Sequence, residues 1–200
     1  MVKIELLKDG NYVHHCGGSL INENYVMTAA HCLENIDIKD LRLLLGTDDI
    51  EDTDGQFFRK VRKVQKSHIY PKYDGVTVYF DVALIKLNEE VELSAGIHPI
   101  CLPEESIDDL DKRSNDLATL TGWGTPNRDD PTASSKLRLT RLAIFPQTYC
   151  NQSYDVGGRI GARIKVSMPQ LFQDNVFCAG YEVSSVTQDS KDKTLTLHTT

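Results

Sequence analysis

The sequence predicts an all-β fold, and three observations lead to this prediction. Short runs rich in β-branched and aromatic residues recur along the 200-residue chain, turn residues separate these runs, and sustained helical periodicity is scarce. Strands that follow one another without helices between them are typical of an antiparallel barrel or sandwich, because a parallel sheet needs long crossover connections. We therefore expect an antiparallel all-β architecture.

The expected strands begin at the first residues. Apolar and charged residues alternate over 2–6, and the Asp9-Gly10 pair predicts a hairpin turn that leads into a strand at 12–14. A polar turn at 22–24 separates the next two strands. In chain order, the further strands are expected at 19–21, 25–28, 41–45, 57–65, 82–87, 117–121 and 137–145.

Charge and hydropathy narrow the function classes. The formal net charge is −7, and the only clustered basic residues, at 59–63, flank a valine and are interpreted as the solvated face of a strand. No apolar stretch is long enough to span a bilayer, and residues 1–7 lack the continuous apolar region of a signal peptide. We expect no nucleic-acid partner, no membrane insertion and no signal peptide in this chain.

The five cysteines form an odd set, which in a secreted chain leaves one thiol free or bonded to another polypeptide. The spacing favours the disulfides Cys16–Cys32 and Cys150–Cys178 and leaves Cys101 over. A competing interpretation is a zinc site, although the paired spacings of known zinc sites are absent. Its ligands would come from His14, His15, Cys16, His31 and Cys32.

Several motifs stand in a fixed order along the chain. Residues 28–32, Thr-Ala-Ala-His-Cys, place a histidine beside a cysteine, and residues 81–84, Asp-Val-Ala-Leu, place an acidic residue at the start of a strand. The other matching segments are 15–20 (His-Cys-Gly-Gly-Ser-Leu), 99–103 (Pro-Ile-Cys-Leu-Pro), 122–124 (Gly-Trp-Gly) and 177–180 (Phe-Cys-Ala-Gly). In these motifs and in their order, the chain resembles the trypsin/chymotrypsin family of serine endopeptidases, from residue 1 to about 190.

The resemblance implies a trypsin-like double antiparallel β-barrel with a catalytic His31 and Asp81. In that arrangement the histidine takes the serine proton, and the buried aspartate orients the imidazole and stabilises the imidazolium. The resemblance also implies that Asp189 lies at the base of the specificity pocket, which favours arginine or lysine before the cut. Cys101 matches a cysteine that bonds to a propeptide or regulatory chain in multidomain relatives.

The same resemblance divides the chain into parts. We expect a first β-barrel lobe at 1–100, a connector at 101–116, a partial second lobe at 117–183 and a divergent polar tail at 184–200. The first barrel would lack the N-terminal segment of the family, and the second barrel would be incomplete.

Two departures from the family pattern bear on activity. The chain lacks the family's Ile-Val-Gly-Gly start, and Gly-Asp-Ser-Gly-Gly-Pro, which carries the nucleophile, is absent from all 200 residues. After Asp189 and Ser190 the sequence continues as Lys-Asp-Lys-Thr. Ser190 is therefore not expected to be the nucleophile, and the histidine and aspartate would have no hydroxyl to activate.

Two functions follow as alternatives. The first is an extracellular, zymogen-activated serine endopeptidase that is represented by an incomplete chain, inactive as given, with protein or peptide substrates and protease inhibitors as partners. The second is a protease homologue without catalysis that binds a protease, inhibitor or receptor through its loops. Neither function calls for a cofactor or a metal. The acidic run at 48–54 is interpreted as solvated charge rather than a calcium site, and Asn151 begins a glycosylation sequon.

Overall fold

The structure, a computed structural model, describes residues 1–49, 58–103, 116–125, 132–146, 178–180 and 196–197. The chain divides into two compact units. The first comprises Met1–Leu102 and Thr121–Leu139, and the second comprises Pro103–Leu120 and Thr140–Thr199. Within the described ranges no helix is long and apolar enough to cross a membrane.

Strands account for most of the regular structure in the described residues, as the sequence predicts, and the helical segments there are two single 3₁₀ turns. The elements are β1 Val2–Lys8, β2 Asn11–Asn22, β3 Tyr25–Thr28, η1 Ala30–Cys32, η2 Ile38–Asp40, β4 Leu41–Leu45, β5 Lys60–Ile69, β6 Ala83–Leu87, β7 Leu117–Gly122, β8 Arg138–Phe145, β9 Cys178–Gly180 and β10 Thr196–Leu197.

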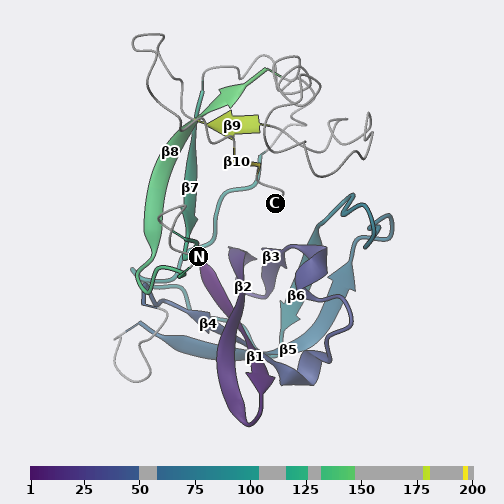
Figure 1. Ribbon diagram of the computed structural model, residues 1–200. Helices are drawn as coiled ribbons and strands as arrows, with labels where there is room; N and C mark the ends of the chain where they lie inside the picture. The colour runs from purple at the N-terminus through teal and green to yellow at the C-terminus, as the bar shows by residue number, and fades with distance from the viewer. Residues whose placement is uncertain (50–57, 104–115, 126–131, 147–177, 181–195, 198–200) are drawn as a thin grey trace. The chain divides into compact units, whose positions relative to one another are not determined.

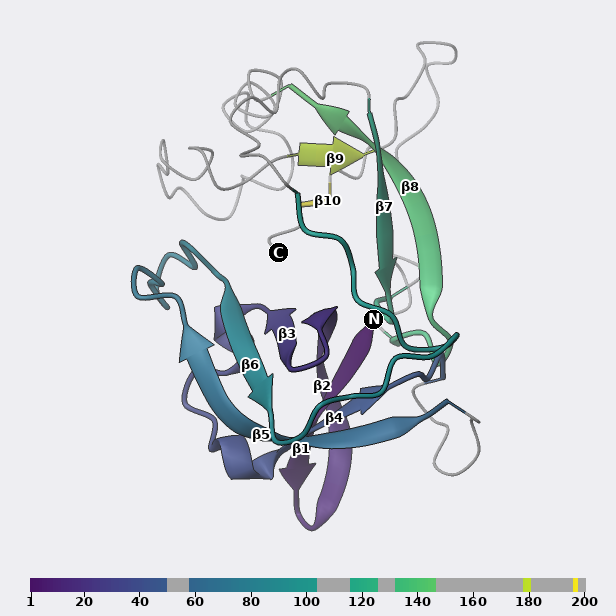
Figure 2. The same cartoon turned by 180° about the vertical axis from the view of Figure 1, so that it is seen from behind.

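Six antiparallel strands form a closed barrel in the first unit (Figures 1 and 2). Their order is β1-β2-β3-β6-β5-β4, and β4 returns to pair with β1. Closure matters because it leaves no strand of the barrel with an unpaired edge that could pair with another chain. The predicted antiparallel barrel is confirmed, and its first lobe closes with these six strands.

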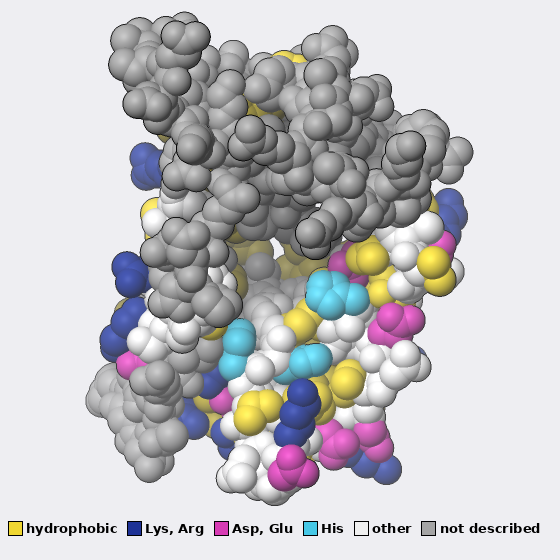
Figure 3. Space-filling view, in the orientation of Figure 1, with side chains coloured by type: hydrophobic (Ala, Val, Ile, Leu, Met, Phe, Trp, Pro, Cys, Tyr) yellow, Lys and Arg dark blue, Asp and Glu magenta, His cyan; other side chains and the backbone are white. Residues whose placement is uncertain are grey.

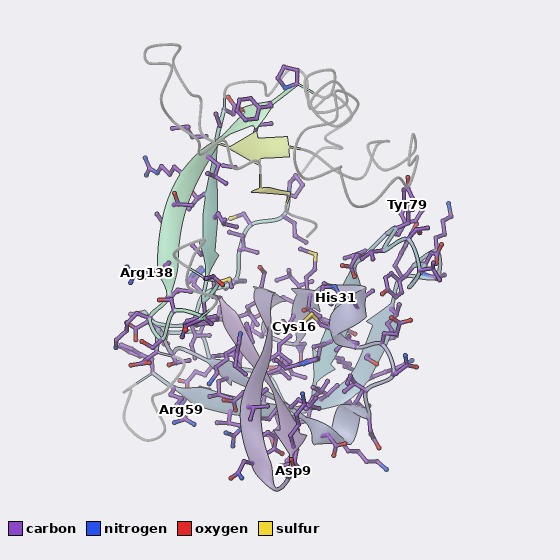
Figure 4. All side chains as sticks on the ribbon, in the orientation of Figure 1. Asp9, Cys16, His31, Arg59, Tyr79 and Arg138 are labelled. Atoms are coloured by element: carbon purple, nitrogen blue, oxygen red, sulfur yellow. A yellow bond between two sulfur atoms is a disulfide. The ribbon has the colours of Figure 1, made fainter. Side chains whose placement is uncertain are left out.

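The hairpin between β1 and β2 has the turn that its sequence predicts. Asp9 has a φ of 50° and Gly10 a φ of 80°, the two positive values that a type I′ turn requires. Asp9 lies at the tip of this hairpin in Figure 4. The turn therefore fixes the register of Glu5–Lys8 against Asn11–His14, and a bulge between Ile4 and Glu5 shifts the pairing beyond it.

A glycine inside β2 is explained by close packing. A Cβ atom on Gly18 would lie 2.8 Å from Cγ1 of Val26 and 3.0 Å from the carbonyl oxygen of Met27. Both neighbours belong to β3, which pairs with β2. Any larger residue at position 18 would therefore require the Val26 side chain or the Met27 carbonyl to shift.

Strand bounds follow pairing more closely than local sequence. The expected strand at 41–45 is β4 without change, whereas the segments at 12–14 and 19–21 merge into the long strand β2. The strand expected at 57–65 begins later and continues to Ile69, because its second half pairs with β6 through His68 and Ile69. Neighbouring strands thus extend β5 through a polar stretch that no local preference marks as strand.

Every second residue of a strand faces the inside of the barrel, and the apolar residues at these positions form the core. Val2 and Ile4 from β1, Leu43 from β4 and Ile85 from β6 have no exposed surface. The remaining buried members of the cluster are Leu6, Leu20, Val26, Ala30, Leu33, Leu41, Leu45, Ala83, Leu87, Val91 and Ile97.

The charged face of β1 is buried as well. Lys3 is 4% exposed and Glu5 is 3% exposed, although their alternation with apolar residues is typical of a solvated strand face. The Lys3 Nζ atom lies 2.6 Å from Glu5 Oε1, and Arg42 Nε donates to Glu5 Oε2. Arg42 in turn stacks 3.9 Å above the ring of Tyr12. The carboxylate of Glu5 therefore compensates two cations.

In the second unit, the described strands form a sheet in the order β10-β9-β8-β7. Strand β8 pairs with β9 through Ala143 and Gly180, and the Ile144 N–H donates to the carbonyl of Asp116 over 2.9 Å. These strands give the second lobe the antiparallel pairing that the sequence predicts.

We expect Glu5→Gln to lower the free energy of unfolding by about 3–5 kcal/mol, because it removes the buried carboxylate that faces the Lys3 ammonium and the Arg42 guanidinium. Urea unfolding followed through the single tryptophan would measure the loss. Glu92→Gln, at an exposed glutamate, is the matched control and should change stability by less than about 0.5 kcal/mol. Equal effects of the two substitutions would contradict the ion-pair argument.

We also expect pH dependence from His14. Desolvation, and then the charge of Lys3, lower the pKa of His14 below its ordinary value of 6.5, while Glu5 opposes the shift. As the pH falls through 6.5 towards the lowered value, the unfolded chain binds more protons and stability decreases.

NMR titration of the His14 ring should therefore show a midpoint below the ordinary value of 6.5, and Lys3→Met should raise it. The variant His14→Gln should lose less stability on acidification from about pH 7 to 5. A midpoint at the ordinary value in the folded protein would contradict this explanation.

Candidate active site

His31 lies in the 3₁₀ turn η1, directly after strand β3. Ala29 is extended at the start of the turn, and the N–H groups of Leu33 and Glu34 both donate to the carbonyl of Ala30. The Ala30 side chain is fully buried, so small residues allow the turn to pack against the barrel. The His31 side chain is nevertheless 56% exposed. Figure 3 shows histidine side chains at the surface on this face of the molecule.

Strand pairing brings Asp81 to His31 across 50 residues of sequence. Thr28, at the end of β3, pairs with Ala83, at the start of β6, so the residues just beyond each strand meet at the same end of the barrel. The Tyr70 N–H donates to the carbonyl of Val82 and holds the chain beside Asp81. The sequence predicts both residues of this pair, and the register explains their meeting.

Both carboxylate oxygens of Asp81 are bound by His31. Nδ1 of the ring lies 2.7 Å from Oδ2, and the backbone N–H of His31 donates to Oδ1 over 2.8 Å. Only 1% of the Asp81 side chain is exposed. A buried carboxylate accepts but does not donate, so it favours the tautomer with the proton on Nδ1 and leaves the Nε2 lone pair free.

A disulfide fixes η1 to β2. The sulfurs of Cys16 and Cys32 are bonded, with 6.2 Å between their Cα atoms. Nε2 of His15 lies 2.8 Å from the carbonyl oxygen of Cys32, which adds a second link between the same elements. His31 and Cys16 lie close together in Figure 4. The histidine turn is therefore fixed to β2 by two links.

The disulfide also bears on the zinc interpretation. Ligand atoms of Cys16, His31 and Cys32 lie within 4.8 Å of one another, the one such group found in the described part of the chain. Two of its three atoms are bonded to each other, so the oxidised protein does not offer their thiolates to a metal. His14 lies apart from the group, with its ring 6.1 Å from that of Trp123.

The loop that precedes Asp81 contributes a feature that sequence reasoning missed. The Tyr73 hydroxyl donates to Oε2 of Glu34 over 3.1 Å and so ties this loop to the segment after η1. Within the loop, the N–H of Val76 and then the Thr77 hydroxyl bind the Asp74 carboxylate and lower its pKa. Only the turn residues Asp74 and Gly75 signal this structure in the sequence.

The backbone just before Asp81 is strained. Val78 and Phe80 have φ values of 58° and 52°, in the left-handed region that bulky side chains avoid. Each such residue costs about 1–3 kcal/mol, which the surrounding contacts must offset. One of these contacts is the Val78 N–H, which donates to the carbonyl of Asp74 over 2.7 Å.

Several predicted residues fall outside the described ranges or are only partly described. Asp189, Cys150 and Asn151 lie outside them, and for Cys178 the structure describes only the backbone in β9. Cys101 is exposed and has a free thiol. At the start of the acidic run, the Asp49 carboxylate lies 2.9 Å from Nζ of Lys136 and the Asp48 carbonyl accepts from the Trp123 indole.

The first unit is thus a closed antiparallel β-barrel that carries an exposed histidine oriented by a buried aspartate. Residues 1–190 match the family model described as Trypsin, and the chain therefore belongs to the trypsin family. This confirms the family resemblance on which the motif assignments rest.

Curated relatives agree with the family. Clotting factor C of Tachypleus tridentatus is 32% identical over 173 residues, which are 84% of this chain and 16% of that protein. Serine proteinase stubble of Drosophila melanogaster is 36% identical over 88% of this chain and 20% of its own length. Trypsin-1 of Salmo salar is 32% identical over 84% of this chain and 59% of its own length. The chain thus spans less than two thirds of each of these relatives.

A solved structure shares the fold. The crystal structure of a scabies mite inactivated protease paralogue matches with a TM-score of 0.71 and covers 90% of this chain and 69% of that one. The two sequences are 20% identical, so this likeness concerns the fold alone.

We expect Asp81→Asn to invert the tautomer of His31. In the variant, the amide oxygen must still accept from the backbone N–H of His31, so the NH₂ group faces Nδ1 of the ring. Nδ1 must then accept a hydrogen bond from this NH₂ group, and the ring proton moves to Nε2. Nitrogen-15 NMR of the ring would show the change, and the ring of the exposed His68 is the internal control. An unchanged His31 tautomer in the folded variant would contradict the assignment.

Proposed function

We propose that this chain carries the histidine and aspartate of a serine endopeptidase site, with His31 as general base and Asp81 as its orienting partner. The observation that supports this proposal is the double hydrogen bond between the two residues. It holds the ring in one orientation, with Nε2 as the free basic atom on a side chain that is 56% exposed. A base placed in this way can take the proton of a hydroxyl nucleophile.

The chemistry that this pair can perform depends on a nucleophile. The buried Asp81 carboxylate would stabilise the imidazolium that forms when Nε2 takes a proton from a serine hydroxyl. The 200 residues contain no Gly-Asp-Ser-Gly-Gly-Pro segment to supply that hydroxyl or the backbone N–H groups that stabilise the oxyanion. We therefore propose that the 200-residue chain by itself does not hydrolyse peptide bonds.

The substrate class and setting are proposed from the resemblance. Asp189 in the specificity pocket would select arginine or lysine before the cut, because a desolvated carboxylate binds a cationic side chain. The Cys16–Cys32 disulfide suits an extracellular protein that acts on proteins and is bound by protease inhibitors. The exposed thiol of Cys101 is free to bond to a regulatory or propeptide chain.

A second function is a protease homologue that binds without catalysis. The observation that favours it is the absence of the nucleophile segment from the 200 residues. The genomic or alternative transcript sequence that follows the codon for Ser190 distinguishes the two functions. An open frame that encodes Cys-x-Gly-Asp-Ser-Gly-Gly-Pro favours the endopeptidase, and its absence favours the binding protein.

We expect the purified 200-residue chain to show no turnover of arginyl or lysyl amide substrates and no labelling by serine-directed phosphonates. A chain that begins with the family's Ile-Val-Gly-Gly segment and continues after Ser190 with the nucleophile segment should gain both properties. In that extended chain, His31→Ala should lower kcat by at least about 10²–10⁴-fold, the usual contribution of a positioned base.

The exposed His68 provides the matched control, and His68→Ala should leave activity unchanged. Robust turnover by the 200-residue chain that is abolished by His31→Ala would overturn the proposed inactivity. An extended chain that is equally active with and without His31 would overturn its role as the base.

A further inference from the structure

Three metal-ligating atoms meet beside the proposed catalytic pair. Sγ of Cys16, Sγ of Cys32 and Nε2 of His31 lie within 4.8 Å of one another, and the distance from Nε2 to the Cys32 sulfur is 3.5 Å. Two thiolates and an imidazole, with an open fourth position, form a known type of zinc site. In the oxidised protein, the bond between the sulfurs is what keeps this group from binding a metal.

The distances fit zinc once that bond is broken. Tetrahedral zinc with ordinary bond lengths places a nitrogen and a sulfur ligand about 3.6 Å apart and two sulfur ligands about 3.8 Å apart. The nitrogen-to-sulfur distance of 3.5 Å already matches. The sulfur-to-sulfur distance, 2.01 Å in the disulfide, has to increase, and Sγ of Cys16 already lies within 4.8 Å of Nε2.

The surroundings of the ring also suit a metal ligand. A histidine that binds zinc usually donates its other ring N–H to a carboxylate, which fixes the tautomer and the ring orientation. Asp81 Oδ2 lies 2.7 Å from Nδ1 of His31 and provides that contact. The ring therefore presents Nε2, the atom that zinc needs, and its exposure leaves room for water at the fourth position.

We propose that reduction of the Cys16–Cys32 disulfide turns this group into a zinc site, with Cys16, Cys32 and His31 as protein ligands. A phosphine reductant and one water convert the disulfide into two thiols and are themselves converted into a phosphine oxide. A dithiol reductant does the same and leaves as its own disulfide. Zinc then binds the two thiolates and the imidazole and releases two protons.

Zinc binding would occupy the atom on which the proposed base depends. Nε2 cannot hold zinc and accept a proton at the same time, so the zinc-loaded site has no free base. This consequence alone rests on the proposed function of His31. The metal site itself depends only on the geometry of the three ligands and Asp81.

Cobalt binding tests the site without any activity assay. In a variant with Cys101→Ser, Cys150→Ser and Cys178→Ser, the remaining two cysteines are reduced with a phosphine and Co²⁺ is titrated without oxygen. We expect the charge-transfer and visible bands of a tetrahedral cobalt thiolate at one metal per chain, and displacement by Zn²⁺. Before reduction, the same protein should give no such bands.

Substitutions in the same background assign the ligands. His31→Ala should abolish the tetrahedral spectrum, and Asp81→Asn should weaken zinc binding by about 10–100-fold. His68→Ala, at an exposed histidine of β5, is the matched control and should leave binding unchanged. Fluorescence of Trp123, which is 3% exposed, reports whether the fold persists after reduction.

Three outcomes of the metal titrations would overturn the proposal. They are a reduced, folded chain that gives no tetrahedral cobalt spectrum, equal zinc affinity with and without His31, and loss of the fold on reduction that zinc does not restore. Protection of Cys16 and Cys32 from alkylation by zinc, mapped on peptides, is a second supporting measurement. Unprotected thiols at saturating zinc would likewise overturn it.

Discussion

The pairing of β3 with β6 is the contact on which the barrel and its site both depend. It joins Thr28 to Ala83, two residues that are far apart in the sequence, and it completes the ring of six strands. Without it, β3 and β6 would each have an unpaired edge. The residues just beyond these two strands, His31 and Asp81, would also lose the framework that brings them together.

Two buried carboxylates show how the barrel tolerates polar groups. Glu5 is compensated by the ammonium of Lys3 and the guanidinium of Arg42, so its charge is neutralised within a small cluster. Asp81 is compensated by a backbone N–H and an imidazole from one residue. The first arrangement places full charges together and has a structural role, whereas the second leaves a basic nitrogen free at the surface.

The 3₁₀ turn η1 is held rigidly and carries the reactive imidazole of His31. The Cys16–Cys32 disulfide and the His15 contact with the Cys32 carbonyl hold the turn on one side, while Asp81 holds the ring on the other. Because these links converge on two consecutive residues, His31 and Cys32, they fix where Nε2 points. Because Asp81 occupies Nδ1, Nε2 is both the proposed base and the proposed zinc ligand.

Local sequence determined much of this protein. Alternating apolar residues and the Asp9-Gly10 turn predict the first hairpin, and the motifs around His31 and Asp81 are enough to identify the family. Tertiary structure decided the rest, because it depends on partners that are distant in the sequence. Pairing with β6 extends β5 through polar residues, and burial encloses Lys3 and Glu5 on a strand face that their alternation marks as solvated. The link from Tyr73 to Glu34 likewise forms because the pairing of β3 with β6 places their loops side by side, which no local pattern encodes.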